Sequence, residues 1–157
     1  MRKRIIDTVQ QEAAPPESEW LNVEGLAEVE ITSEDAAHPI ESALLPGGTA
    51  GWRAAGPGRQ TIRLRFASPQ SLRRIRLRFE ETAATRTQEY VMRWSADGGR
   101  SFREIVRQQW NFSPGDASSE TEDHHVELPA VTVLELSIIP DISGGAAVAS
   151  LARLQLA

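Results

Sequence analysis

Two stretches of the chain alternate strictly between apolar residues and arginine, which is the pattern of β-strands with one buried face. Residues 61–66 read TIRLRF and residues 74–79 read RIRLRF. Successive side chains of a strand point to opposite faces of a sheet, so this period of two places the apolar residues inside and the arginines outside. An amphipathic helix would instead repeat its apolar residues every three or four positions. The two stretches therefore predict two strands of an antiparallel sheet.

Much of the remaining chain carries the same kind of pattern in short runs bounded by Gly, Pro, Asp or Ser. The runs are residues 26–32, 89–95, 102–108, 125–129, 132–139 and 149–156. Asp97-Gly98-Gly99 separates two of them, and glycine supplies the positive φ that tight hairpins require. We therefore predict an all-β chain of roughly eight strands, with residues 38–45 as a short helical turn.

Composition and charge limit the classes of protein that the chain resembles. Its 157 residues suit one domain, for which we expect residues 19–157, preceded by an extension at 1–18 with a short helix and a proline-containing linker. The absence of cysteine excludes disulfides and thiolate chemistry, and the net charge of −5 speaks against bulk nucleic-acid binding. The chain has no apolar run of signal-peptide or membrane-spanning length, so we expect a cytoplasmic protein without membrane contact.

Three longer motifs resemble one known family in both their residues and their order. They are HPIESALLPGGTAGWRA at 38–54, QTIRLRFASPQSLRRIRLRFEE at 60–81 and EYVMRWSADGGRSFREI at 89–105. Together they resemble the discoidin, or coagulation factor 5/8 type C, family over about residues 26–157. The matching positions are Ala43, Leu44, Trp52, Tyr90, Ser95, Asp97, Gly98 and Phe102. The resemblance implies a galactose-binding-like jelly roll, a fold that carbohydrate-binding modules share and that also serves the binding of lipids, proteins and nucleic acids.

The chain departs from this family at the position of its structural calcium. The family usually has a carboxylate in the loop after Leu44 and a Glu in the last strand, whereas this chain has Leu45-Pro46 and Arg153. Calcium requires about six to eight oxygen ligands, so the loss of two carboxylates is serious. We expect no metal and no cofactor at this position, with Gly47, Gly48 and Arg153 holding the loop instead.

Trp110 and Asn111 form a candidate ligand-binding pair at the end of a strand. They precede the turn-rich loop SPGDASS at 113–119. An exposed indole next to an amide provides an apolar face for the C–H groups of a sugar and a directional hydrogen-bonding group. In the alternative, Trp110 and Phe112, which alternation places on one side of the strand, both pack into the end of the core.

Three further residues are candidates for ligand contacts, each with a structural alternative. Arg86 lies where sugar-binding members of the family often place an arginine, although an ion pair with Glu81 or Glu89 is equally compatible with the sequence. Arg53 follows a glycine-rich loop and can reach a ligand or pair with an acidic loop. His38 lies in the loop after the first strand, where it either contacts the ligand or stays in solvent.

The outward arginines are the strongest charge feature of the sequence. If the two alternating strands are neighbours, the arginines at 63 and 65 lie beside those at 74, 76 and 78, and an unpaired ladder of this kind attracts phosphate. In the alternative, acidic residues of adjacent strands interleave with the ladder. The candidates for this role are Glu28, Glu30, Glu127 and Glu135.

The stretch ETEDHH at 120–125 resembles a catalytic or metal site only at first sight. His124 and His125 are consecutive, so in a strand their side chains point to opposite faces and do not share one metal ion. The acids at 120, 122 and 123 are explained by a charged strand face. No nucleophile–base pair or phosphate loop is recognisable elsewhere, so we expect no enzyme.

We therefore predict a jelly-roll β-sandwich that binds a carbohydrate or a similar polar ligand without catalysis. The alternative is a protein-interaction scaffold that uses the arginine-bearing sheet face. Residues 52–62, WRAAGPGRQTI, support this alternative, because they are similar to the amino-terminal domain of a single-strand-break DNA repair scaffold. A protein partner is compatible with either interpretation, whereas nucleic acid is not expected.

Overall fold

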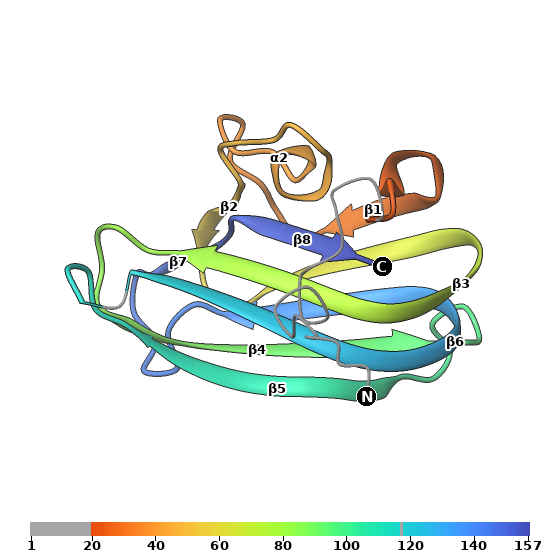
Figure 1. Cartoon of the computed structure of the whole chain (residues 1–157). Helices are drawn as coiled ribbons and strands as arrows, with labels where there is room; N and C mark the ends of the chain where they lie inside the picture. Colours follow the sequence, from red (N-terminus) through yellow and green to blue (C-terminus); the bar gives the residue numbers. More distant parts are fainter. Residues whose placement is uncertain (1–19, 117) are drawn as a thin grey trace, which may run out of the picture.

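Strands dominate the computed structural model, which describes residues 20–116 and 118–157 (Figure 1). The extension expected at residues 1–18 lies outside the described residues. Two short helical turns, η2 (Val23–Gly25) and α2 (Glu41–Leu44), flank the first strand. The eight strands of the described part are β1 (Ala27–Ile31), β2 (Trp52–Pro57), β3 (Gln60–Glu80), β4 (Arg86–Ser95), β5 (Arg103–Phe112), β6 (Ser119–Ile139), β7 (Val148–Leu151) and β8 (Arg153–Leu156).

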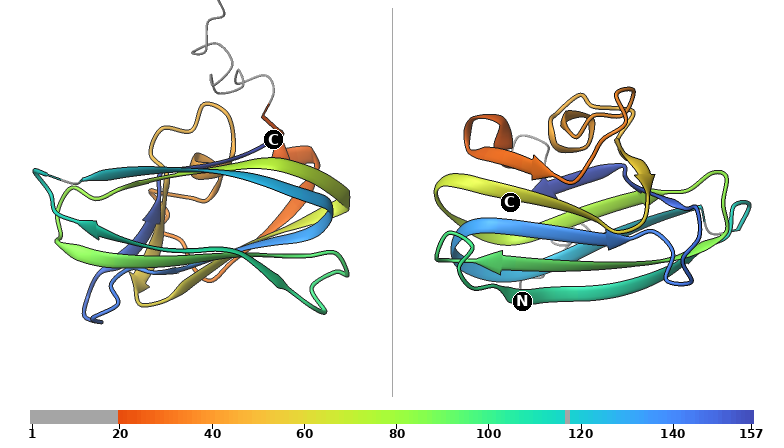
Figure 2. Two further views of the ribbon diagram at one scale, coloured as in Figure 1. Left: turned by 60° about the horizontal axis from the view of Figure 1, so that its bottom comes forward. Right: turned by 180° about the vertical axis from the view of Figure 1, so that it is seen from behind.

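The strands form an antiparallel sandwich, as the alternating pattern predicts. Six strands share one hydrogen-bonded sheet in the order β1-β3-β6-β4-β5, with β8 joined to β3, while β2 and β7 form a separate pair. β8 pairs with the second half of β3, whereas β1 pairs with the first half. The continuous sheet therefore contributes to both layers of the sandwich, which Figure 2 shows from two further directions.

The two longest strands, β3 and β6, connect the layers. Residues 60–65 pair with residues 133–138, and residues 74–80 pair with residues 119–125. Between these segments the register shifts three times, and both strands turn back together at the right-hand side of Figure 1. Register shifts of this kind bend a strand and increase its twist. Each strand thus continues from one layer into the other.

This continuity corrects one expectation from the sequence. The two alternating arginine stretches, at 61–66 and 74–79, are two halves of β3 and not neighbouring strands. Residues 125–129 and 132–139 are likewise parts of β6. The segment between the two arginine stretches contains Pro69 but no glycine, and it bends through the register shifts instead of forming a tight turn. The two arginine groups therefore lie in different layers and do not form one ladder.

The core lies between the layers and takes the apolar residue at every second position. Tyr90 of β4 packs on Phe79 of β3 with 5.2 Å between the ring centroids, which joins the two layers. Trp52 is 1% exposed and donates from its indole nitrogen to the carbonyl of Ser33. The fully buried aliphatic side chains include Ile62, Leu64, Leu72, Ile75, Leu77, Leu134 and Leu136. These side chains form one apolar core that spans both layers of the sandwich.

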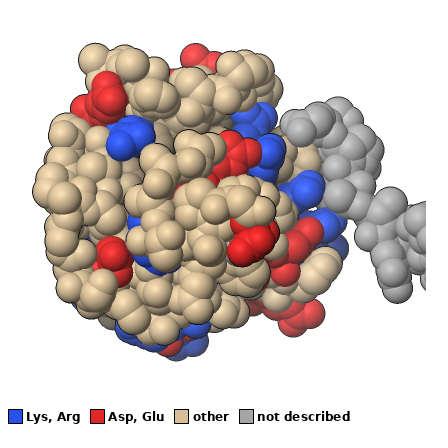
Figure 3. Space-filling view, turned by 90° about the vertical axis from the view of Figure 1, so that its left-hand side faces the viewer, with Lys and Arg blue, Asp and Glu red and all other residues tan. Residues whose placement is uncertain are grey.

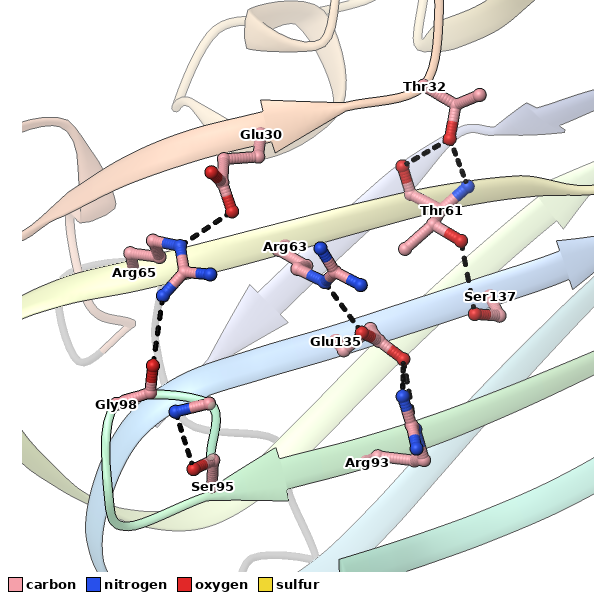
Figure 4. Close-up of polar contacts among 11 residues, drawn as sticks. Glu30, Thr32, Thr61, Arg63, Arg65, Arg93, Ser95, Gly98, Glu135 and Ser137 are labelled. Carbon is pink, nitrogen blue, oxygen red and sulfur yellow. Dashed lines mark hydrogen bonds and ion pairs between the residues drawn. The ribbon is translucent and has the colours of Figure 1, made fainter. Parts of the chain in front are cut away.

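The outward arginines of the first half of β3 are paired with acids, as the interleaved alternative predicts. Glu135 of β6 accepts hydrogen bonds from Arg63 at 2.6 Å and from Arg93 at 2.9 Å (Figure 4). Arg65 donates to Glu30 at 2.6 Å and to the carbonyl of Gly98 at 3.1 Å. This face of the sheet therefore offers little unpaired positive charge to phosphate.

The two histidines of β6 lie on opposite faces, as alternation predicts. His124 points between the layers, where its Nε2 lies 2.9 Å from the Tyr90 hydroxyl in a hydrogen bond, whereas His125 is exposed. Glu120, on the same inner face, is only 6% exposed. This differs from the sequence-based expectation that Glu120 belongs to a charged strand face. Burial, together with charge repulsion from Glu122, raises the pKa of Glu120 to about 8.

Removing the charge of Glu135 tests the role of the ion-pair cluster in stability. Burial alone would raise the pKa of Glu135, but the hydrogen bonds from Arg63 and Arg93 hold it below its usual value. We expect Glu135→Gln to lower the free energy of unfolding by about 1–3 kcal/mol, measured by urea denaturation at neutral pH. Glu30→Gln is the matched control, because that pair is solvent-exposed and contributes about 0–1 kcal/mol. Equal losses in the two variants would contradict this role.

Glu120 predicts an unusual dependence of stability on pH. A carboxyl with a raised pKa binds its proton in the folded state after the unfolded state has lost it, so stability falls as pH rises. We expect the parent to lose stability between about pH 5 and about pH 8, and Glu120→Gln to lose less over the same range. Urea denaturation at several pH values measures both. Identical profiles would show that Glu120 is not protonated in the folded protein.

Candidate functional site

A cleft opens at the loop end of the sandwich, the end that faces the viewer in Figure 3. Its volume is about 280 Å³. On this end of the molecule, acidic and basic residues are scattered among uncharged ones (Figure 3). The loops at 81–85 and 140–147 form part of its wall. The lining residues are His38, Ala50, Trp52, Arg53, Glu80, Glu81, Thr82, Ala83, Ala84, Ala146, Ala147, Val148, Ser150, Leu151 and Ala152.

His38 and Arg53, two of the residues predicted from the sequence, are brought together in this cleft. The backbone N–H of Arg53 donates to the carbonyl of His38 at 3.2 Å, and the N–H of Asp35 donates to the carbonyl of Arg53 at 2.8 Å. These bonds fix the start of β2 against the loop after β1. The Arg53 side chain is exposed, so its guanidinium is available to a ligand.

Arg86, another predicted ligand contact, is buried behind the cleft. It forms an ion pair with Glu81, which was one of the structural alternatives to a ligand contact. Its side chain is fully buried, and its Nε donates to Glu81 at 2.6 Å. Its Nη1 donates to the carbonyl of Pro140 at 2.8 Å and to Gln88 at 3.2 Å, and its guanidinium lies 4.7 Å from the centre of the Phe112 ring. Arg86 thus links the two loops of the wall from the inside.

Glu81 joins Arg86 to the loop that follows Glu81 in the chain. One carboxylate oxygen accepts the bond from Arg86, while the other accepts the backbone N–H groups of Ala83 at 3.1 Å and Ala84 at 3.3 Å. Burial would raise the pKa of Glu81, but these hydrogen bonds lower it below its usual value. The carboxylate therefore stays ionised and keeps the alanine-lined loop in place.

Trp110 and Asn111 do not line the cleft. Trp110 is 37% exposed, whereas Phe112 on the same side of β5 is fully buried. The alternative that both pack into the core is therefore wrong for Trp110, because β5 is the edge strand of its sheet. Asn111 lies on the other side of β5, where its side-chain oxygen accepts a hydrogen bond from Thr87 at 2.7 Å. Both residues therefore lie apart from the cleft that His38 and Arg53 line.

Several cleft residues carry no signal in the sequence. Ser150, Thr82 and the alanines at 83, 84, 146 and 147 belong to loops and strand ends that only the sandwich brings together. Short loops of alanine and small polar residues are common and point to no particular chemistry. The cleft thus combines small alanine side chains with polar groups such as His38, Arg53 and Ser150.

The residues at the family's calcium position do not fit a metal ion. Arg153 Nη1 donates to the carbonyl of Leu45 at 2.9 Å and to that of Gly48 at 3.3 Å, so a cationic group already binds the loop oxygens. This confirms the expected role of Arg153. Gly48 is required for close approach, because a Cβ there would lie 2.2 Å from the carbonyl oxygen of Ser42. Among the described residues no three His, Cys, Asp or Glu side chains are grouped to hold a metal ion.

Comparisons with known proteins find similarity in structure and not in sequence. No protein-family model matches the chain, and a search of curated proteins found no match. Three of the similar solved structures are family 32 carbohydrate-binding modules. That of NanJ from C. perfringens, in complex with galactose, is 15% identical with a TM-score of 0.59, and the match covers 83% of this chain and 92% of that one.

The other two structures extend the same result. CpGH89CBM32-5 from Clostridium perfringens, in complex with GalNAc-β-1,3-galactose, is 21% identical with a TM-score of 0.59 over 87% of this chain and 98% of that one. The module of AlyQ, in complex with 4,5-unsaturated mannuronic acid, is 14% identical with a TM-score of 0.60 over 84% and 95%. The chain therefore has the galactose-binding-like sandwich fold of these modules. No helix in the described part is long and apolar enough to cross a membrane.

Replacing Arg153 tests whether its guanidinium holds the loop in place of a metal. We expect Arg153→Ala to lower the free energy of unfolding by about 1–3 kcal/mol, because two loop carbonyls lose a charged donor. Arg103→Ala, at an exposed position on β5, is the control and is expected to change stability little. Calcium is expected to leave the melting temperature of the parent unchanged. Micromolar calcium binding in isothermal titration would contradict the assignment.

Proposed function

We propose that this protein is a non-catalytic carbohydrate-binding module whose ligand occupies the cleft at the loop end. The observation that carries the proposal is the cleft itself, with His38 and Arg53 side by side on a fold whose solved examples include complexes with galactose and GalNAc-β-1,3-galactose. Its volume of about 280 Å³ is at the lower limit of small-ligand pockets and suits one sugar ring.

The lining provides the two kinds of contact that a sugar requires. Arg53 offers a planar set of donors to adjacent hydroxyls, and His38 offers a ring nitrogen whose donor or acceptor role depends on its tautomer. The loop alanines provide small apolar surfaces for C–H groups. The Trp52 ring lies beneath the cleft but is 1% exposed, so it supports the floor and does not stack on a ligand. Arg86 positions the wall through Glu81 and Pro140.

The same residues support binding without catalysis. His38 and Ser150 both line the cleft, but the described structure contains no hydrogen bond between them. The Ser150 hydroxyl instead donates to the carbonyl of Glu80 at 3.4 Å, and His38 Nδ1 lies 3.6 Å from a carboxylate oxygen of Asp35. A nucleophile requires a base within hydrogen-bonding reach, and this pair does not provide one.

Binding measurements with cleft variants test the proposal. We expect isothermal titration to detect galactose or a GalNAc-containing disaccharide, and expect Arg53→Ala and His38→Ala each to weaken binding about tenfold, since each removes a polar contact. Trp110→Ala is the control and is expected to bind like the parent, because Trp110 lies outside the cleft. Binding that is lost in Trp110→Ala but kept in both cleft variants would move the site to β5. A glycan array without any hit would overturn the carbohydrate assignment.

A further inference from the structure

A second hollow, which we call the arginine groove, borders the cleft. Its volume is about 710 Å³, and it runs over the outer face of the second half of β3 and of β8. The groove and the cleft share Glu80 and Ala152 in their linings, so the two hollows adjoin each other. The lining residues of the groove are Pro46, Gly47, Gly48, Thr49, Arg76, Arg78, Glu80, Ala152, Arg153 and Gln155.

The arginine groove is positively charged on a chain whose net charge is −5. Three arginines and one glutamate line it. Arg78 and Arg153 are directly opposite each other in the β3–β8 register, and like charges in that position destabilise a sheet. Glu80 offsets part of this charge through its ion pair with Arg78.

Arg76 is the residue best placed to bind such an anion. Its neighbour across the β3–β6 register is Asp123, the acid that would be expected to neutralise it. Both carboxylate oxygens of Asp123 instead accept hydrogen bonds from Arg74, one of them at 2.7 Å. Within the described residues no hydrogen bond or ion pair joins Arg76 to Asp123, and the Arg76 charge acts on that carboxylate only from a distance. Arg153 is engaged differently, because its bonds to Leu45 and Gly48 fix the wall of the groove.

We propose that the cleft and the arginine groove form one continuous surface for an acidic glycan, in which a carboxylate of the sugar chain is bound by Arg76 and Arg78. The inference rests on the proposed carbohydrate function and adds the ligand class. A guanidinium matches the two oxygens of a carboxylate, and a charged hydrogen bond of this kind is stronger than a neutral one. The cleft then holds one neutral or acidic ring, and the groove selects for charge on a neighbouring ring.

Titration with matched oligosaccharides tests the ligand class. Tetragalacturonate and its fully methyl-esterified counterpart have the same length and differ in charge. We expect the parent to bind the acid about tenfold more tightly than the ester, and expect added salt to weaken binding of the acid alone. Arg76→Gln/Arg78→Gln is expected to bind acid and ester equally. Arg103→Gln, an exposed arginine of β5 outside both hollows, is the control and keeps the preference.

The outcomes separate this inference from the proposed function. Equal binding of acid and ester by the parent would overturn the acidic ligand and leave the carbohydrate function standing. Competition by inorganic phosphate as effective as that by free galacturonate would also overturn it, because the groove would then be a general anion site. If neither oligosaccharide nor any neutral glycan binds, both proposals fail. A melting temperature of the double variant close to that of the parent confirms that the folded state is compared.

Discussion

The pairing of β3 with β6 is the contact on which the rest of the structure depends. These two strands turn from one layer of the sandwich into the other while they stay hydrogen-bonded to each other on both sides of the bend. The half formed by residues 60–65 and 133–138 pairs with β1 and β4, and the half formed by residues 74–80 and 119–125 pairs with β8. Because both layers grow from one bent pair, the relative position of the layers is set by backbone hydrogen bonds as well as by core packing. The contact of Tyr90 with Phe79 then closes the interior between them.

Buried or half-buried guanidinium groups organise the loops on this framework. Arg86 joins two loops of the cleft through Glu81 and Pro140, and Arg153 binds the carbonyls of Leu45 and Gly48. A guanidinium is well suited to both positions, since its five donors lie in one plane and it stays charged at any physiological pH. At the second position its positive charge lies against two loop carbonyls. The abundance of arginine therefore has a structural basis beyond the outer face of the sheet.

The cleft and the arginine groove differ in the balance of charged residues that line them. Acidic residues around the cleft are neutralised by basic partners, as Glu81 is by its hydrogen bond from Arg86. The cleft lining is therefore close to neutral where a sugar hydroxyl would bind. In the groove the balance is positive, because Arg74 takes the acid that lies opposite Arg76. A binding module with both surfaces would recognise a ring and its charged neighbour together. This arrangement is a property of cross-strand register, which decides which arginine receives the acid.

The sequence by itself determined the sandwich class, the inward and outward faces of the strands and the role of Arg153, because these follow from local periodicity and from residue types at motif positions. It correctly placed His124 and His125 on opposite faces. It also named His38 and Arg53 as candidate ligand contacts, and the structure places both in the lining of one cleft. Only the tertiary structure decided that the two arginine stretches are halves of one bent strand, that Arg86 lies buried and that Trp110 lies apart from the cleft. These properties depend on which distant segments pair and on which edge a strand occupies. Alternation within a single strand carries no information about either.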